Sequence, residues 1–175
     1  QQVRLTFGTR TGEVRVGAVG RHLGEAFAAA VALGLVLDLA FDDLVNGLGS
    51  FEPMAHRMQV HHVQGATILD DTHNANRESY IYALGELQRA HPGGRRLAVL
   101  GDMLELGIFS AADHAAVGSQ AGFVDELATI GTDAAILGEK AMAAGVNQAN
   151  YRHFETNSGA ADSSGAAVEE AADWL

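Results

Sequence analysis

From residue 57 onward, short apolar runs alternate with longer stretches of helical spacing, and this alternation constrains the fold more than any other feature. The apolar runs have strand length and are rich in Val, Ile and Leu, and GATILDD and RRLAVLG are apolar enough to predict buried strands. Strands are predicted at residues 57–63, 65–71, 95–101, 126–131 and 151–154, and helices at 77–90, 110–123, 132–144 and 158–175. Such alternation predicts an α/β fold, a Rossmann-like, mainly parallel sheet with flanking helices.

The first 53 residues follow a different pattern. They predict a β-hairpin formed by Val3–Phe7 and Glu13–Val19. A buried Ala-rich helix is predicted at Leu23–Leu37 and a short second helix at Phe41–Phe51. Pro53 then interrupts the chain. We therefore predict a domain boundary near Pro53, with a small hairpin-and-helix segment of a preceding domain at 1–53 and the sheet domain at 54–175.

Composition excludes several classes of partner. The formal net charge of −11 argues against nucleic-acid binding, which needs Lys and Arg to neutralise phosphates, and against an anionic membrane surface. There is no cysteine, so disulfides and thiolate metal sites are excluded. The longest apolar run, Phe27–Phe41, contains Asp38 and is shorter than the roughly 20 residues of a membrane span. The sequence does not begin with a signal-peptide pattern. We therefore expect a cytoplasmic location and no membrane insertion.

Two polar clusters follow consecutive buried strands of the predicted sheet. DDTHNANRES occupies residues 70–79, and GDMLELG occupies residues 101–107. In open α/β sheets, ligands bind at the carboxyl ends of the strands, so these clusters predict a polar cleft. The structural alternative is that Asp70 and Asp71 cap the next helix while the asparagines form turns.

Common phosphate and metal motifs are missing. The one lysine, Lys140, is followed by Ala141, so the sequence has no Walker A loop, and GAVGRHLG at Gly17–Gly24 lacks GxGxxG spacing. His62, Asp71 and His73 could form a metal site only in principle, because no HExxH or HxH spacing supports one, and we predict no metal ligands. Four other histidines are expected at the surface or at helix ends: His22, His91, His114 and His153.

Several of these segments together resemble the Mur ligases. The resemblance runs from about Gly20 to about His153 and rests on GRH, HRMQV, ATILDDTHNANRESYIYALGEL, RRLAVLGDMLELG and HAAVG. The pair DDTHNAN and LGDMLELG, in this order and at this separation, is specific. Within the family, these motifs are most similar to the branch that adds D-alanyl-D-alanine to a UDP-linked muramoyl tripeptide.

The resemblance implies an ATP-dependent, magnesium-dependent amide-forming ligase of peptidoglycan precursor synthesis. In the family, ATP phosphorylates a carboxylate and an amine then attacks the acyl phosphate. A central domain carries the P-loop and the magnesium ligands, and a Rossmann-like C-terminal domain closes the site. The chain is therefore expected to hold the tail of the central domain and most of the C-terminal domain, without its last strand, and to be inactive by itself.

The resemblance also assigns roles to seven residues. Arg57 is the expected catalytic group, which reaches toward the phosphates. The expected nucleotide-binding residues are Asp71, His73 and Asn74. The expected substrate-binding residues are Asn76, Asp102 and Glu105. In the last group, the acidic loop residues are expected to orient the dipeptide and its ammonium.

The sequence departs from the family pattern in several places. Leu23 and Ala26 stand where Asn is expected near adenine, and His56 stands where Gly precedes the arginine. His73 replaces an aromatic residue, and Arg77 replaces a frequent Pro. The alternative hypothesis is a non-catalytic α/β module, derived from such a domain, that binds a small ligand or a protein. A relative of the folylpolyglutamate synthetases is a third hypothesis, against which the NAN and ELG motifs argue.

Overall fold

The computed structural model describes residues 1–90, 93–156, 169–171 and 174, and it divides the chain into two compact units. The units are Gln1–His73 and Asn74–Leu175. The assignment of residues 1–53 to a preceding domain stays a prediction. Within the described residues, no helix is both long and apolar enough to cross a membrane.

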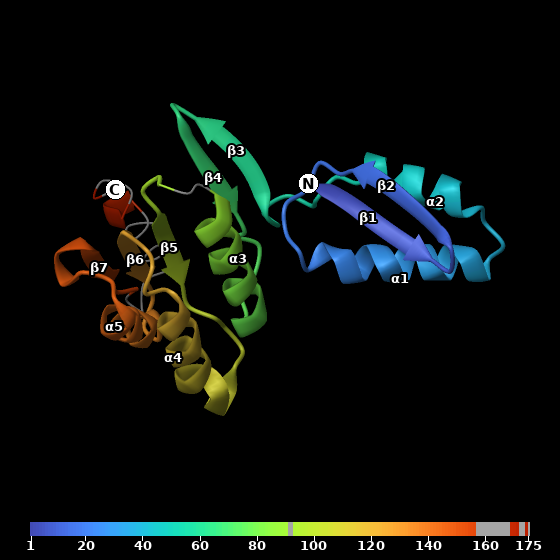
Figure 1. Cartoon of the computed structure of the whole chain (residues 1–175). Helices are drawn as coiled ribbons and strands as arrows, with labels where there is room; N and C mark the ends of the chain where they lie inside the picture. Colours follow the sequence, from blue (N-terminus) through green and yellow to red (C-terminus); the bar gives the residue numbers. More distant parts are fainter. Residues whose placement is uncertain (91–92, 157–168, 172–173, 175) are drawn as a thin grey trace. The chain divides into compact units, whose positions relative to one another are not determined.

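The first unit begins with a hairpin, as predicted, but its second strand starts three residues and ends four residues before the predicted Glu13–Val19. Strands β1 (Gln2–Phe7) and β2 (Arg10–Arg15) pair antiparallel, and Gly8 supplies the positive φ of 60° that the turn needs. Helix α1 (Leu23–Val36), helix α2 (Phe41–Gly47) and a 3-10 turn (Leu48–Ser50) follow, close to the predicted bounds. In Figure 1 the two helices lie against the hairpin.

A small apolar core holds the hairpin and helices together. It consists of Val31, Phe41 and Val45, with partly buried leucines around them. Only one stripe of α1 contributes to this core, because Leu33 and Val36 on its other faces are exposed. The prediction of a buried helix is therefore wrong for most of the circumference of α1 within this unit.

Strands β3 (Gln59–Val63) and β4 (Ala66–Asp70) form a second antiparallel hairpin. Its two turn residues, Gln64 and Gly65, both have positive φ, as a tight two-residue hairpin turn requires. The prediction that residues 65–71 form a buried strand of the parallel sheet is wrong, because β4 pairs with β3 and its first three residues are exposed. The apolar run correctly predicted a strand but did not show which strand it pairs with.

The second unit contains the predicted parallel sheet, reduced to three strands in the order β5-β6-β7. Its elements are α3 (Arg77–Ala90), β5 (Leu97–Gly101), a 3-10 turn (Gly107–Phe109), α4 (Ser110–Gln120), β6 (Glu126–Ile130), α5 (Ala134–Ala144), a 3-10 turn (Gln148–Asn150) and β7 (Tyr151–Phe154). Most of the helix predicted at 158–175 lies outside the described residues, of which 169–171 and 174 are helical.

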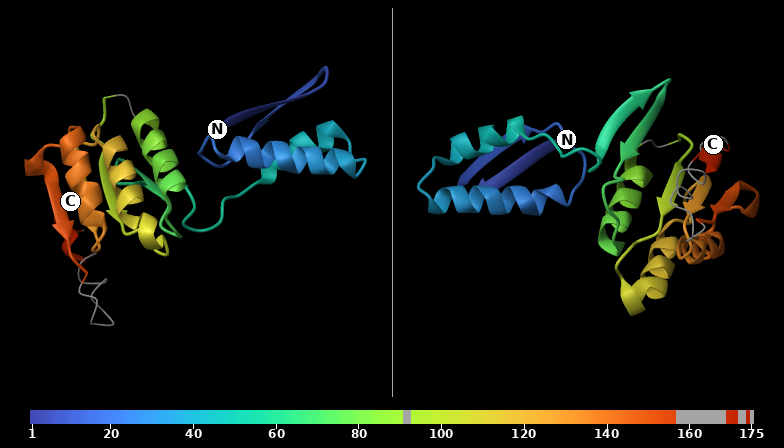
Figure 2. Two further views of the ribbon diagram at one scale, coloured as in Figure 1. Left: turned by 90° about the horizontal axis from the view of Figure 1, so that it is seen from below. Right: turned by 180° about the vertical axis from the view of Figure 1, so that it is seen from behind.

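The core of the second unit joins the sheet to its helices. Leu84 of α3, Leu100 of β5, Val117 of α4, Leu127 of β6 and Leu137 of α5 are all buried in one cluster. Figure 2 shows these strands side by side, with the helices packed along them. Strand β5 was predicted to be fully buried, but its residues alternate between buried and exposed. One face of this strand therefore supplies the core.

Helices α4 and α5 approach closely through glycine. A Cβ placed on Gly118 would lie within 2.2 Å of the backbone oxygen of Leu137 and 2.8 Å of the Cβ of Lys140. Backbone atoms on a packed helix cannot move aside without shifting the helix. A side chain at Gly118 is therefore incompatible with the observed spacing of α4 and α5.

We expect Gly118→Ala to lower the free energy of unfolding by about 1–3 kcal/mol through overpacking. The matched control is Gly85→Ala in α3, where the nearest atoms belong to the flexible guanidinium of Arg89. That control should be neutral or stabilising, since Ala favours helix more than Gly. Urea unfolding of both variants measures the difference, and equal stability would contradict the tight contact.

Candidate functional site

The seven predicted site residues are distributed over both units. Arg57, Asp71 and His73 belong to the first unit, and the second contains Asn74, Asn76, Asp102 and Glu105. Each group is described within its own unit.

Arg57 lies at the centre of a strained turn that precedes β3. Its neighbours His56 and Met58 have φ of 61° and 49°, the left-handed region that costs non-glycine residues energy. The amide of His56 donates to Oε1 of Gln59 at 3.0 Å, and the amide of His73 donates to the carbonyl of His56 at 3.0 Å. The chain on both sides of the β3–β4 hairpin therefore holds the turn.

The side chain of Arg57 is exposed and makes no ion pair within the part of the chain that the structure describes. Its backbone is fixed by the amide, which donates to the carbonyl of Met54 at 3.2 Å. A guanidinium presents several donors in a planar fork that matches carboxylate or phosphate. This turn can therefore offer a cationic group to an anionic ligand.

Asp71 is half-buried and accepts one hydrogen bond, from the amide of Met58 at 3.1 Å to Oδ1. Burial raises the pKa of the Asp71 carboxyl, against the opposing effects of the Met58 hydrogen bond and the positive charges of His22 and Arg57. The carboxylate therefore holds the start of β3 at some cost in stability when it is ionised.

The pKa of the adjacent Asp70 is shifted in the opposite direction. Its Oδ2 lies 2.8 Å from Nδ1 of His56, and its Oδ1 accepts from the amide and the hydroxyl of Thr72 at 3.1 and 2.8 Å. The hydrogen bond from His56, followed by that from the Thr72 hydroxyl, lowers the pKa of the Asp70 carboxyl. Asp70 thus stabilises the strained residue next to Arg57.

We expect Asp71→Asn to be at least as stable as the unmodified chain at neutral pH. In the folded state the Asp71 pKa is raised, so stability falls as pH rises from the ordinary value of 3.8 through the raised one. Asn keeps the acceptor for Met58 but cannot ionise, so this fall should shrink. Denaturant unfolding over a pH series measures it.

The matched control for this change is Asp71→Ala, which also removes the acceptor. It should lose about 1–3 kcal/mol, because the amide of Met58, a residue only 5% exposed, loses its partner. A lower stability for Asp71→Asn than for the unmodified chain at neutral pH would show instead that the charge is net stabilising.

The NAN segment begins helix α3. Asn76 and Ser79 form a reciprocal cap: Oδ1 of Asn76 accepts from the amide of Ser79 at 2.9 Å, and the hydroxyl of Ser79 accepts from the amide of Asn76 at 3.0 Å. His73 and Asn74 are exposed, and no side-chain hydrogen bond is found for either among the described residues. The structural alternative is wrong about the aspartates, because Asn76 caps α3 while Asp70 and Asp71 bond to residues outside that helix. His73 and Asn74 keep their polar groups available.

Asp102 connects the end of β5 to the start of α5. Its two carboxylate oxygens accept from the amides of Thr132 at 2.9 Å and Ala134 at 2.7 Å. Gly131, at φ 121°, leaves room for this carboxylate, since a Cβ there would lie within 2.4 Å of it. The negative charge caps the positive end of the helix.

Glu105 occupies the middle of the same loop. It is exposed, and its φ of 64° is again left-handed. Large apolar side chains beside it are exposed as well: Leu104, Ile108 and Phe109. Glu105 is therefore displayed at the surface, whereas Asp102 is occupied by backbone amides.

No sequence signal indicated the role of His114, which was expected at the surface or at a helix end but is fully buried. Its ring lies between the amide of Met103 and the carbonyl of Ser110, and the Ser110 hydroxyl donates to Oδ2 of Asp133 at 2.5 Å. Ser110 is the first residue of α4, whose N-cap is Phe109. A hydrolase triad has His between Ser and Asp, whereas here the Ser110 hydroxyl lies between Asp133 and Nδ1 of His114, which is 3.3 Å from it. This cluster is therefore not a nucleophilic triad.

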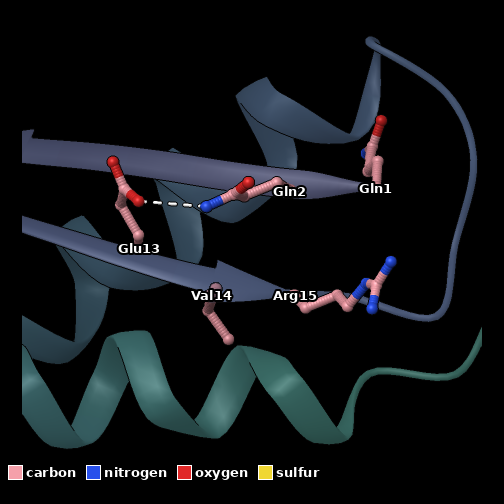
Figure 3. Close-up of a pocket in the computed structure, with 5 residues that line it drawn as sticks. All are labelled: Gln1, Gln2, Glu13, Val14 and Arg15. Atoms are coloured by element: carbon pink, nitrogen blue, oxygen red, sulfur yellow. Dashed lines mark hydrogen bonds between the residues drawn. The ribbon is translucent and has the colours of Figure 1, made fainter.

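No group of three or more His, Asp or Glu within the described ranges could hold a metal ion. Figure 3 shows a hollow on the first hairpin, lined by Gln1, Gln2, Glu13, Val14 and Arg15. There, Gln2 donates to Glu13 at 3.0 Å, an ordinary exposed cross-strand contact. The hollow contains none of the predicted site residues and carries no candidate chemistry.

We expect Asp102→Ala to lower the free energy of unfolding by about 1–3 kcal/mol, because the amides at the start of α5 lose their acceptor. Ala134 has no exposed surface, so water cannot replace the carboxylate there. Glu105→Ala on the same loop should change stability by less than about 0.5 kcal/mol. Thermal or urea unfolding compares the two, and equal effects would refute the capping role of Asp102.

Comparison with known proteins identifies the fold and the family. The family model described as Mur ligase, glutamate ligase domain, matches residues 56–174. The chain belongs to the Mur ligase family. The UDP-N-acetylmuramoyl-tripeptide–D-alanyl-D-alanine ligase of Synechocystis is 34% identical over 137 residues, which cover 77% of this chain and 29% of that protein.

Solved structures agree with this assignment. MurF from Acinetobacter baumannii superimposes with a TM-score of 0.74 at 26% identity, over 89% of this chain and 33% of that one. MurF from Thermotoga maritima, solved in complex with ADP, shares the fold with a TM-score of 0.62 at 24% identity, over 83% of this chain and 31% of that one. The chain thus spans about a third or less of the length of these Mur ligases.

Proposed function

We propose that this chain is part of an ATP-dependent ligase that joins D-alanyl-D-alanine to UDP-N-acetylmuramoyl-tripeptide in the cytoplasm during peptidoglycan precursor synthesis. Support comes from relatives that carry this name and from the two polar loops, which match the motifs of that branch. The observation that carries the proposal is the exposed Arg57, held in a strained turn beside the carboxylate of Asp71.

The proposed reaction has two steps. A carboxylate oxygen of the tripeptide attacks the γ-phosphorus of ATP, which gives an acyl phosphate and releases ADP. The amino group of D-alanyl-D-alanine then attacks the acyl carbon, loses a proton and expels inorganic phosphate, leaving an amide bond. Negative charge accumulates on the transferred phosphoryl group in the first step, where a positioned guanidinium stabilises it.

In this proposal Arg57 supplies that guanidinium. The strain at His56 and Met58 supports such a role, because strained backbone persists where the surrounding structure enforces it and is frequent at functional sites. Asp71, His73 and Asn74 are the proposed contacts to the nucleotide. Of these, Asp71 is also committed to the amide of Met58 through one oxygen, which leaves Oδ2 for a ribose hydroxyl.

Glu105 is the proposed acceptor for the ammonium of the incoming dipeptide. Both oxygens of Asp102 already accept backbone amides, so the exposed carboxylate of the loop is that of Glu105. Asp102 then contributes by fixing the root of the loop. Asn76, whose Oδ1 caps α3, has its amide nitrogen left to contact substrate.

Magnesium would neutralise phosphate charge in such a reaction. The described residues do not fit a magnesium site, since no cluster of carboxylates suited to the ion is found among them. We therefore assign no residue of this chain to the metal and propose that its ligands, like the P-loop, lie in another part of the ligase.

A non-catalytic binding module is the second candidate function. The observation that favours it is the presence of Leu23 and Ala26 where the resemblance implies Asn near adenine. Titration calorimetry of the chain with ATP and with D-alanyl-D-alanine separates the two. Binding of the dipeptide that is lost in Glu105→Ala favours the ligase, and absence of binding by either ligand favours the module.

We expect the 175-residue chain alone to release no phosphate from ATP with both other substrates present. The coding sequence on either side should then be read, and the protein that includes it assayed for phosphate release. In that protein Arg57→Ala should lower the rate about 100-fold or more. The matched control is Arg152→Ala, at an exposed arginine of β7, which should leave the rate unchanged.

Two results would contradict this function. Phosphate release by the chain alone, abolished in Arg57→Ala, would show that no further domain is needed. A larger protein that releases phosphate at the same rate with and without D-alanyl-D-alanine would exclude the proposed acceptor.

A further inference from the structure

His114 is the buried polar side chain beneath the loop that joins β5 to α4, residues 102–109. The ring has no exposed surface and lies on α4. Its Nδ1 is 2.8 Å from the carbonyl oxygen of Ser110, and its Nε2 is 3.0 Å from the amide nitrogen of Met103. The imidazole therefore bridges the first turn of the helix and the start of the loop.

These two partners determine which ring nitrogen carries the proton. A carbonyl oxygen can only accept, so Nδ1 must donate to Ser110. A backbone amide can only donate, so Nε2 must be the bare acceptor for Met103. The geometry thus requires the neutral imidazole protonated at Nδ1, and neither the other tautomer nor the imidazolium can make both hydrogen bonds.

The hydrogen bond to Met103 acts at a critical place in the chain. Met103 is only 2% exposed, and within the described residues its amide has no other acceptor. It directly follows Asp102, which is tied to α5, and it lies two residues before Glu105. The far end of the loop is tied again, where the hydroxyl of Ser110 donates to Asp133.

We propose that His114 is a positioning residue, which through its bare Nε2 holds the β5–α4 loop in the conformation that displays Glu105. Without this acceptor, the loop keeps its hydrogen bonds at Asp102 and Ser110 and the apolar contacts of Met103 and Leu106. It loses the hydrogen bond that fixes its backbone between Asp102 and Glu105. The conformation of the loop does not depend on the proposed function. Only the use of Glu105 for the incoming amine rests on that function.

The first test reads the tautomer in the unmodified chain. Histidine labelled with ¹⁵N gives separate signals for the two ring nitrogens in two-bond ¹H–¹⁵N correlation spectra at neutral pH. We expect one ring with a protonated Nδ1 and a bare Nε2, and expect this signal to be absent from His114→Asn. A protonated Nε2 at His114 would overturn the proposal.

The second test uses two variants, each of which keeps a polar group at the position of only one of the two ring nitrogens. The amide of Gln reaches the position of Nε2, so His114→Gln keeps an acceptor for Met103. The amide of Asn reaches only the position of Nδ1, so His114→Asn keeps the donor to Ser110 and loses that acceptor. Amide hydrogen exchange of Met103 and of Phe109, whose amide donates to the carbonyl of Leu106, measures the loop, and the exchange of core amides in β6 serves as the internal reference.

In His114→Asn we expect these loop amides to exchange about tenfold faster or more, relative to the β6 reference. In His114→Gln they should stay within about threefold of the unmodified chain. Equal loop exchange in both variants would overturn the proposal. If neither variant folds, the tautomer in the unmodified chain decides. Because no substrate is needed, failure here is distinguishable from failure of the ligase assignment.

Discussion

The contact between the Asp102 carboxylate and the first amides of α5 is the interaction on which the second unit depends. It joins the end of β5 to the loop after β6, so that two neighbouring strands end at one fixed point. The amides at a helix start have no partner within the helix, and a buried one must find an acceptor elsewhere. Gly131 makes the contact possible, because any Cβ at that position would occupy the space of the carboxylate. The loop that displays Glu105 starts from this fixed point.

In the first unit, hydrogen bonds hold the backbone on both sides of Arg57. Two adjacent carboxylates hold the turn around Arg57, and their electrostatics are opposite. Asp70 is bonded to His56 and Thr72 and its pKa is lowered, whereas Asp71 is half-buried with a single amide donor and its pKa is raised. The contacts of Asp70 stabilise the folded state, whereas the ionised carboxylate of Asp71 lowers its stability. A half-buried carboxylate with a raised pKa next to an exposed guanidinium is typical of binding sites.

Local sequence signals predicted the elements of this chain more accurately than their partners. The bounds of α3 agree with prediction, because the Asn76 and Ser79 cap marks its start and the sequence after Ala90, HPGG, is of a type that stops helices. Strand β4 was predicted as a strand but was placed in the wrong sheet. An apolar run of this length forms a strand in either setting, and the Gln64–Gly65 turn that pairs it with β3 is a two-residue feature within a longer run.

The family and the approximate location of its polar loops were determined by the sequence itself, because DDTHNAN and LGDMLELG are contiguous motifs whose order and separation can be read directly. The division of work among their residues was decided by tertiary structure. Asp102 and Glu105 are both acidic residues of one short loop, yet one caps a helix that begins about thirty residues later and the other stands exposed. His114 likewise owes its burial and its tautomer to Met103, eleven residues away. Hydrogen bonds between distant segments leave no periodic pattern in the chain, so only the folded structure shows them.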